Sequence, residues 1–219
     1  MDDIVTHMRS TLEKANVKGL PEYMRKLQAN AKSEGNFEDV RLEGRAAIMF
    51  SKAGFDVTMG DSPDLALKFN NEVFYAEVKH FREKAQDRID AARMSEPDDL
   101  LVPYGDTFPL EGKHAWQQVY DVAKKKIDQY EEHAPNFLVI ESSSTSIEDT
   151  EIRTAIDAIN QDVRSGKCPG LAKLNGILLV SGWHSISQQW RNVYRFATSS
   201  PAVLLSRELS ALIYKICFG

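Results

Sequence analysis

The feature that most constrains this chain is a pair of short, largely apolar runs separated by only three residues. The runs span residues 63–69 and 73–79, and Asn70, Asn71 and Glu72 lie between them. Asn tolerates left-handed backbone conformations and bonds locally to its own chain, so the sequence predicts a turn and a β-hairpin. A hairpin requires an antiparallel pair of strands, and it places the start of the first strand beside the end of the second.

Three ionisable residues occupy that shared end of the hairpin. Asp64 stands near the start of the first run, and Glu77 and Lys79 close the second. Because successive side chains of a strand point to opposite faces, Glu77 and Lys79 are expected on one face. Carboxylates, water and substrate phosphate together hold Mg²⁺, and a neighbouring lysine can orient or activate an attacking water. The pattern therefore indicates phosphodiester chemistry.

A third carboxylate is available from a predicted helix. Apolar residues recur at spacings of three and four over 37–50, and a strand is predicted directly afterwards, over 55–59. Glu43 shares its side of this helix with Ala46 and Phe50, which favours an inward position. The alternative is that Glu43 belongs to a solvated helix face, which is the ordinary place for a glutamate.

A helical Glu, then Pro-Asp, then Glu-x-Lys at the end of a strand resembles the PD-(D/E)XK nuclease superfamily. The resemblance covers roughly residues 37–79, and the stretch 42–57 is similar to the helix-to-strand entry of restriction-endonuclease-like and Holliday-junction-resolvase-like members. It implies an α/β fold with a restriction-endonuclease-like core, in which a mixed β-sheet is flanked by helices in the order α-β-β-β-α-β.

The resemblance also implies roles for individual residues. Asp64 and Glu77 would bind Mg²⁺ or Mn²⁺, with the backbone carbonyl of Val78 as a further ligand. Lys79 would assist the hydrolytic water, and Glu43 would complete the site. These four side chains are the predicted catalytic residues.

Two accessory candidates lie on a helix expected over about 115–132. Several superfamily members carry a Lys or Gln on the helix after Glu-x-Lys that contacts the site or the phosphate, and Lys126 and Gln129 are similar to these. A plain amphipathic helix explains the same stretch without any functional role, because its apolar stripe has the usual helical spacing.

The expected function is therefore that of a metal-dependent nuclease that hydrolyses phosphodiester bonds, with DNA as the expected substrate. The main alternative is a catalytically inactive nuclease-fold module that binds nucleic acid or a protein partner. A third interpretation is a structural protein in which Glu77 and Lys79 form an incidental surface pair. Residues 74–78 are largely apolar, however, and an ionised pair is costly in such a strand.

Charge limits how nucleic acid could bind. The formal net charge is −5, which argues against broad nonspecific affinity and makes local basic patches necessary. Such residues follow both predicted site segments: His80, Arg82, Lys84, Arg88 and Arg93 in the first group, and Lys124, Lys125 and Lys126 in the second. Solvated helix faces interleaved with acids explain them equally well.

The 219 residues suit one substantial domain with a small appendage. We expect an N-terminal helical appendage over 1–34, serving as a cap or a dimerisation element, and a nuclease-like domain over 35–219 with an inserted helix and loop at about 81–113. Further strands are predicted over 136–140, 174–181 and 191–198, and further helices over 148–164 and 206–216. The chain shows no secretory signal, no apolar stretch that would cross a membrane and no disulfide framework, so a cytoplasmic protein is the expectation, and a homodimer is one option for its assembly.

Overall fold

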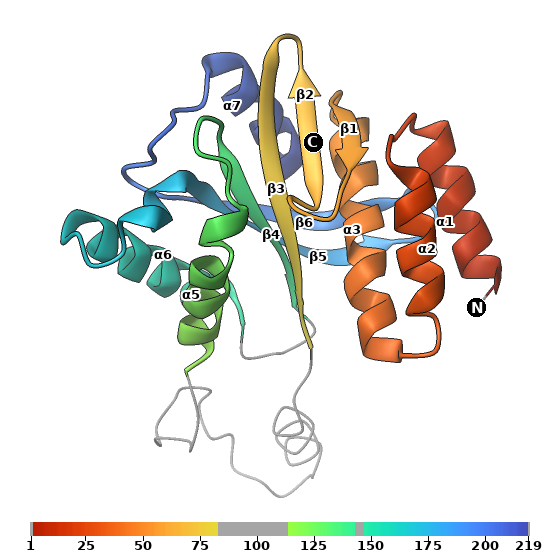
Figure 1. Cartoon of the computed structure of the whole chain (residues 1–219), viewed down its shortest axis with the longest axis horizontal. Coiled ribbons are helices and arrows are strands. Elements are labelled where there is room, and N and C mark those ends of the chain that lie inside the picture. Colours follow the sequence, from red (N-terminus) through yellow and green to blue (C-terminus); the bar gives the residue numbers. More distant parts are fainter. Residues whose placement is uncertain (1, 83–113, 143–146, 219) are drawn as a thin grey trace, which may run out of the picture.

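A computed structural model describes residues 2–82, 114–142 and 147–218 of the chain. These residues form an α/β structure in which a six-stranded, mixed, open sheet is flanked by helices (Figure 1). The helices are α1 (Asp2–Lys14), α2 (Leu20–Ala29), α3 (Glu34–Lys52), α5 (Ala115–Lys125), α6 (Asp149–Arg164) and α7 (Arg207–Phe218), with short 3-10 turns η1 (Ile127–Gln129) and η2 (Pro169–Lys173).

The strands follow one another across the sheet in chain order. They are β1 (Asp56–Met59), β2 (Leu65–Phe69), β3 (Glu72–Phe81), β4 (Asn136–Ser142), β5 (Leu174–His184) and β6 (Gln189–Ala197). The pairs β1–β2, β2–β3 and β5–β6 are antiparallel, and the pairs β3–β4 and β4–β5 are parallel. The centre of the sheet is thus parallel, and its two margins are antiparallel.

Each face of the sheet has its own hydrophobic core. One core joins the sheet to α1, α2, α3 and α7, and the other joins it to α5 and α6 (Figure 1). Alternation along β3 divides its residues between the two, since Phe74, Ala76 and Val78 belong to the first core and Phe81 to the second. No helix within the described ranges is long and apolar enough to cross a membrane.

The predicted hairpin is present, and its two strands differ in length. Asn70 adopts a left-handed conformation with φ of 54° at the turn, and the register pairs Leu65 with Ala76. Strand β3 continues beyond that pair as far as Phe81, paired on its other side with β4. The sheet therefore forks where β2 begins, and among the described residues no strand pairs with the end of β3 on the side away from β4.

The first part of the predicted element order is confirmed, because α3, β1, β2, β3, α5 and β4 give α-β-β-β-α-β. The later strands and helices are also present, and each of their ends lies within three residues of its predicted position. The predicted insertion at about 81–113 falls almost entirely on residues 83–113, which lie outside the described part of the chain. Strand β3 extends two residues beyond Lys79, to Phe81.

The prediction of one helix over 115–132 was wrong at its C-terminal end. Helix α5 ends at Lys125, and the chain passes through the 3-10 turn η1 before reaching β4. The side chain of Asn136 explains the early end, because it accepts a hydrogen bond of 2.9 Å from the N–H of Glu131 and donates one of 2.8 Å to the carbonyl of Glu131. These bonds hold Glu131 in an extended connection that a helix would not permit.

The N-terminal helices α1 and α2 pack directly on α3. Gly44 of α3 makes this close approach possible, since a Cβ at this position would lie 2.2 Å from the hydroxyl oxygen of Tyr23 and 3.0 Å from the sulfur of Met8. Leu12 of α1 and Leu27 of α2 are fully buried in the core that also contains the apolar side of α3. The appendage thus shares a continuous core with the sheet.

Candidate active site

Asp64 lies at the fork of the sheet, immediately before β2. Its Oδ2 accepts a hydrogen bond of 2.8 Å from the backbone N–H of Val78, the first residue after Glu77 on β3. The bond follows from the hairpin register, which sets Asp64 beside Glu77. Asp64 is 6% exposed and Glu77 is 2% exposed, so two acids are buried side by side.

Lys126, at the C-terminal end of α5, contacts both of these acids. Its ammonium hydrogen-bonds to Oε2 of Glu77 and lies 3.7 Å from Oδ2 of Asp64. The other oxygen of Glu77 is buried without a hydrogen-bond partner in the described part of the chain. One of the two predicted accessory residues therefore lies within the site. The other, Gln129, lies in η1 with a buried Oε1 that also has no partner among these residues.

Glu43 approaches the same place from α3, and its partner comes from α2. The Nζ of Lys26 lies 2.8 Å and 3.0 Å from the two carboxylate oxygens of Glu43. Glu43 is 8% exposed, which agrees with the predicted inward position and not with a solvated helix face. We call Glu43, Asp64 and Glu77 the carboxylate cluster.

The acids of the cluster perturb the ionisation of one another. Burial, followed by the negative charge of Asp64, raises the pKa of Glu43 to about 7, and the same two causes raise the pKa of Glu77 to about 7. Burial lowers the pKa of Lys26, but its hydrogen bonds to Glu43 and the surrounding acids outweigh burial and leave that pKa raised. Burial and mutual repulsion thus disfavour the ionised forms of the Glu43 and Glu77 carboxyl groups.

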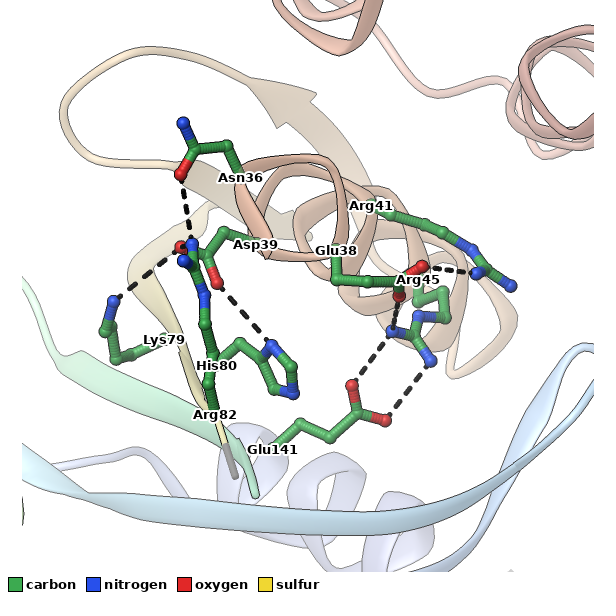
Figure 2. A network of polar contacts seen from close by, with 9 residues as sticks. All are labelled: Asn36, Glu38, Asp39, Arg41, Arg45, Lys79, His80, Arg82 and Glu141. Atoms are coloured by element: carbon green, nitrogen blue, oxygen red, sulfur yellow. Dashed lines mark hydrogen bonds and ion pairs between the residues drawn. The ribbon is translucent and has the colours of Figure 1, made fainter. Parts of the chain in front are cut away.

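Lys79 projects from the same strand as Glu77 but reaches a different acid. Its Nζ lies 3.9 Å from Oδ2 of Asp39, one turn of α3 before Glu43, and its side chain is 37% exposed. Figure 2 shows that Asp39 is shared, because Arg82 donates to it at 2.6 Å and the Nδ1 of His80 lies 3.5 Å away. The predicted catalytic lysine is therefore next to the cluster along β3, with its ammonium directed to α3.

A second polar network ties α3 to the end of β4. Arg45 donates to both oxygens of Glu141, at 3.2 Å and 2.9 Å, and also pairs with Glu38 at 3.3 Å (Figure 2). The indole N–H of Trp190 donates to Glu141 at 3.0 Å. A hollow of about 300 Å³ opens here, and its described lining is Glu38, Arg45, His80, Glu141, Ser142, Ser181 and Gly182. The network fixes the orientation of α3 over the sheet.

The donor set of the cluster fits a hard divalent cation. All of its groups are carboxylate oxygens, which Mg²⁺ and Mn²⁺ prefer, and one oxygen of Glu77 is buried and unpartnered. Within the described residues, no group of three or more His, Cys, Asp and Glu side chains is placed so that it could hold a metal ion by itself. Mg²⁺ needs only one or two carboxylates when water and substrate phosphate supply the rest.

Sequence reasoning brought together Glu43, Asp64, Glu77 and Lys126, but it missed Lys26 and Asp39. Lys26 belongs to the N-terminal appendage, where it neighbours the buried residues Met24 and Leu27 of α2. Its place beside the apolar side of that helix is a weak signal, because Arg25 has the same neighbours and is largely exposed. Asp39 carried no signal beyond its position one helical turn before Glu43.

Comparisons of the chain with protein-family models, with curated proteins and with solved structures gave no match.

Proposed function

We propose that this protein is a metal-dependent nuclease that hydrolyses phosphodiester bonds, with DNA as the expected substrate. The observation that carries the proposal is the pairing of buried Asp64 and Glu77 at the fork of the sheet, with Glu43 beside them. Burying carboxylates this close together is costly, and the two lysines that contact them, Lys26 and Lys126, leave one of the three negative charges uncompensated, so the arrangement favours a cation site. The order α3-β1-β2-β3-α5-β4 further supports a restriction-endonuclease-like core.

Asp64 and Glu77 would hold Mg²⁺ or Mn²⁺, with Glu43 and the backbone carbonyl of Val78 as further ligands. The bound cation would supply Lewis-acid stabilisation of the charge that develops on the phosphate oxygens. The hydrogen bond from the N–H of Val78 fixes the carboxylate of Asp64, so this ligand is held in place before anything binds. Preorganisation of this kind lowers the cost of assembling the site.

The reaction would proceed by attack of a water oxygen on phosphorus, with cleavage of the bond between phosphorus and the leaving alcohol. Lys79 would orient this water through its ammonium or, as the neutral amine, accept the proton that the water loses, and the leaving alkoxide would take up a proton from solvent. Its flexible stem and 37% exposed side chain allow the ammonium to leave Asp39 and turn towards the substrate. Asp39 would keep Lys79 ordered until the substrate arrives.

The charge distribution around the site supports an anionic substrate despite the net charge of −5. Lys26, Lys79, Arg82 and Lys126 come from three different elements or their ends and gather around the acids of the site. All four keep part of the side chain accessible to solvent, as phosphate contacts require.

The test is cleavage of a panel of linear, circular, single-stranded and branched DNA and RNA with Mg²⁺, Mn²⁺ or a chelator. Wild type is compared with Asp64→Ala and Lys79→Ala, and Lys68→Ala serves as the control because Lys68 is an exposed lysine on the neighbouring strand β2. Metal-dependent cutting is expected in wild type and the control. Asp64→Ala is expected to lose cutting and metal binding, and Lys79→Ala to lose cutting alone.

Full activity in either site variant would refute the assignment of residues. A folded wild type that binds Mn²⁺ but cuts nothing in the panel would favour the alternative of an inactive nuclease-fold module. Two contacts favour this alternative: Lys79 is paired with Asp39, and Lys126 is paired with Glu77. A lysine that is already paired with an acid is not available to a substrate until that pair breaks.

A further inference from the structure

We propose that Lys26 and Lys126 are tethered counter-ions that compete with a divalent cation for the carboxylate cluster. The inference rests on the proposed function, because it concerns the same site and the same class of cation. It adds that the metal affinity of this protein is set by two lysines from outside the Glu-x-Lys motif, one on each side of the fork.

Lys126 already bridges the two acids that a cation would join. Its ammonium is hydrogen-bonded to Oε2 of Glu77 and lies 3.7 Å from Oδ2 of Asp64. A divalent cation that drew on these two oxygens would need the space that the ammonium fills, and one bound through the unpartnered Oε1 of Glu77 would still lie close to the ammonium and be repelled by it. The two cations therefore oppose one another at this pair of acids.

Lys26 blocks the third carboxylate in the same way. Its Nζ lies 2.8 Å from one oxygen of Glu43 and 3.0 Å from the other, so both oxygens are engaged. Lys26 belongs to α2, which the packing at Gly44 presses against α3. The N-terminal helices thereby contribute to the chemistry of the site as well as to the core.

The distribution of burial shows which partners can move. The side chains of Glu43, Asp64 and Glu77 are 11%, 8% and 2% exposed, whereas those of Lys26 and Lys126 are 33% and 21% exposed. The carboxylates are held by the packed sheet and helix, and each lysine has a flexible four-carbon stem that leads towards solvent. The lysines can withdraw by rotation about side-chain bonds, and the backbone need not shift.

The arrangement also explains how the site can form without a metal. The ammonium groups of Lys26 and Lys126 compensate two of the three carboxylate charges, so most of the charge of the cluster is balanced by side chains of the protein itself. The same compensation opposes metal binding, because a divalent cation must displace, or bind beside, a partner that is covalently attached and always present. Removing a lysine charge should therefore tighten metal binding, whereas removing a merely structural contact would loosen it.

The experiment is a titration of the full-length, metal-free protein with MnCl₂ at fixed ionic strength, followed by calorimetry and by electron paramagnetic resonance of free Mn²⁺. Lys126→Met and Lys26→Met are compared with two controls, Lys125→Met at the exposed end of α5 and Lys32→Met in the exposed loop after α2. We expect Kd to fall by about tenfold for Lys126→Met and by about threefold for Lys26→Met, with both controls at the wild-type value.

Two further variants separate charge from side-chain shape. Lys126→Gln removes the charge but keeps a hydrogen-bond donor, so it should also bind Mn²⁺ more tightly, and it decides the matter if Lys126→Met does not fold. Lys126→Arg keeps the charge and should bind no more tightly than wild type. Unchanged or weaker Mn²⁺ binding in the folded neutral variants would overturn the competition by the lysines and leave the proposed metal site standing. A wild type that binds no Mn²⁺ would overturn the proposed metal site itself.

Discussion

The backbone N–H of Val78 donates a 2.8 Å hydrogen bond to Oδ2 of Asp64. This bond crosses the end of the hairpin at the point where β2 begins and β3 continues without it. It joins a carboxylate to the strand that carries Glu77, and both groups are buried. Its loss would leave a buried donor without an acceptor.

Asp64→Ala and Asp64→Asn should therefore differ in stability although both remove the charge. Alanine leaves the N–H of Val78 unsatisfied, whereas the side-chain oxygen of asparagine can accept the bond, so we expect Asp64→Ala to be less stable than Asp64→Asn by about 1–3 kcal/mol. Urea unfolding in the presence of chelator measures the difference. Equal free energies of unfolding would show that the bond contributes nothing.

The raised pKa values predict how the stability of the metal-free protein depends on pH. Glu43 and Glu77 have pKa values of about 7 in the folded protein, compared with an ordinary value of 4.5. Between these two values the folded state holds more protons than the unfolded state, so the free energy of unfolding falls as pH rises. The loss is about 3 kcal/mol for one such carboxyl and is complete above the folded pKa.

Urea unfolding at pH 5 and pH 8 with chelator tests this dependence. Glu77→Gln should be less sensitive to pH than wild type, because the amide does not titrate. Glu72→Gln, at the partly exposed start of the same strand, is the control and should respond like wild type. A stability of wild type that rises over this interval would contradict the assigned direction of the shifts.

Arg45 should be among the more sensitive positions of α3. Its side chain is 8% exposed and pairs with Glu141, whose side chain is 13% exposed. Arg45→Met would leave the half-buried carboxylate of Glu141 with only the indole N–H of Trp190 as its remaining partner in this network. We expect a loss of about 3–5 kcal/mol in the free energy of unfolding.

The control for this prediction is Arg41→Met. Arg41 pairs with Glu38 from the same helix, but its side chain is 26% exposed, so its removal should cost less than about 1 kcal/mol. The double variant Arg45→Met/Glu141→Gln should recover part of the loss, since it removes the uncompensated charge. Additive effects of the two single changes would argue against a coupled pair.

Gly44→Ala should weaken the packing of the N-terminal helices on α3. The new methyl group would overlap the hydroxyl of Tyr23, and Tyr23 is 3% exposed, so we expect a loss of about 1–3 kcal/mol. Gly35→Ala is the matched control on the same helix, because its Cβ would meet only the flexible end of Arg82. Gly35→Ala should be neutral or slightly stabilising, and thermal unfolding distinguishes the two.

Much of the site was predictable because its geometry follows from local rules. A two-residue period in β3 and a short turn at Asn70 are enough to bring Asp64 beside Glu77. Helical spacing was enough to turn Glu43 inward. These relationships span a hairpin and a single helix, so they need no knowledge of how distant segments pack.

The unpredicted features depend on packing between distant elements. Lys26 meets Glu43 because α2 lies against α3, and its place between Met24 and Leu27 is too weak a signal to distinguish it from a solvated lysine. Lys79 turns to Asp39 because α3 packs against β3 and brings this acid to 3.9 Å from the Lys79 Nζ. The early end of α5 depends on Asn136, since its amide holds the following connection.

Asp39, Glu43 and Arg45 belong to one continuous helix, α3, in which the rise is about 1.5 Å for each residue, so their relative positions are fixed by the helical backbone. Each of these side chains meets a different partner from another part of the fold: Lys79, Lys26 and Glu141. A small tilt or slide of the helix would therefore change all three contacts at once. Substitutions far apart on α3 should consequently show strong epistasis, and a second change that restores the position of the helix could rescue defects at sites it does not touch.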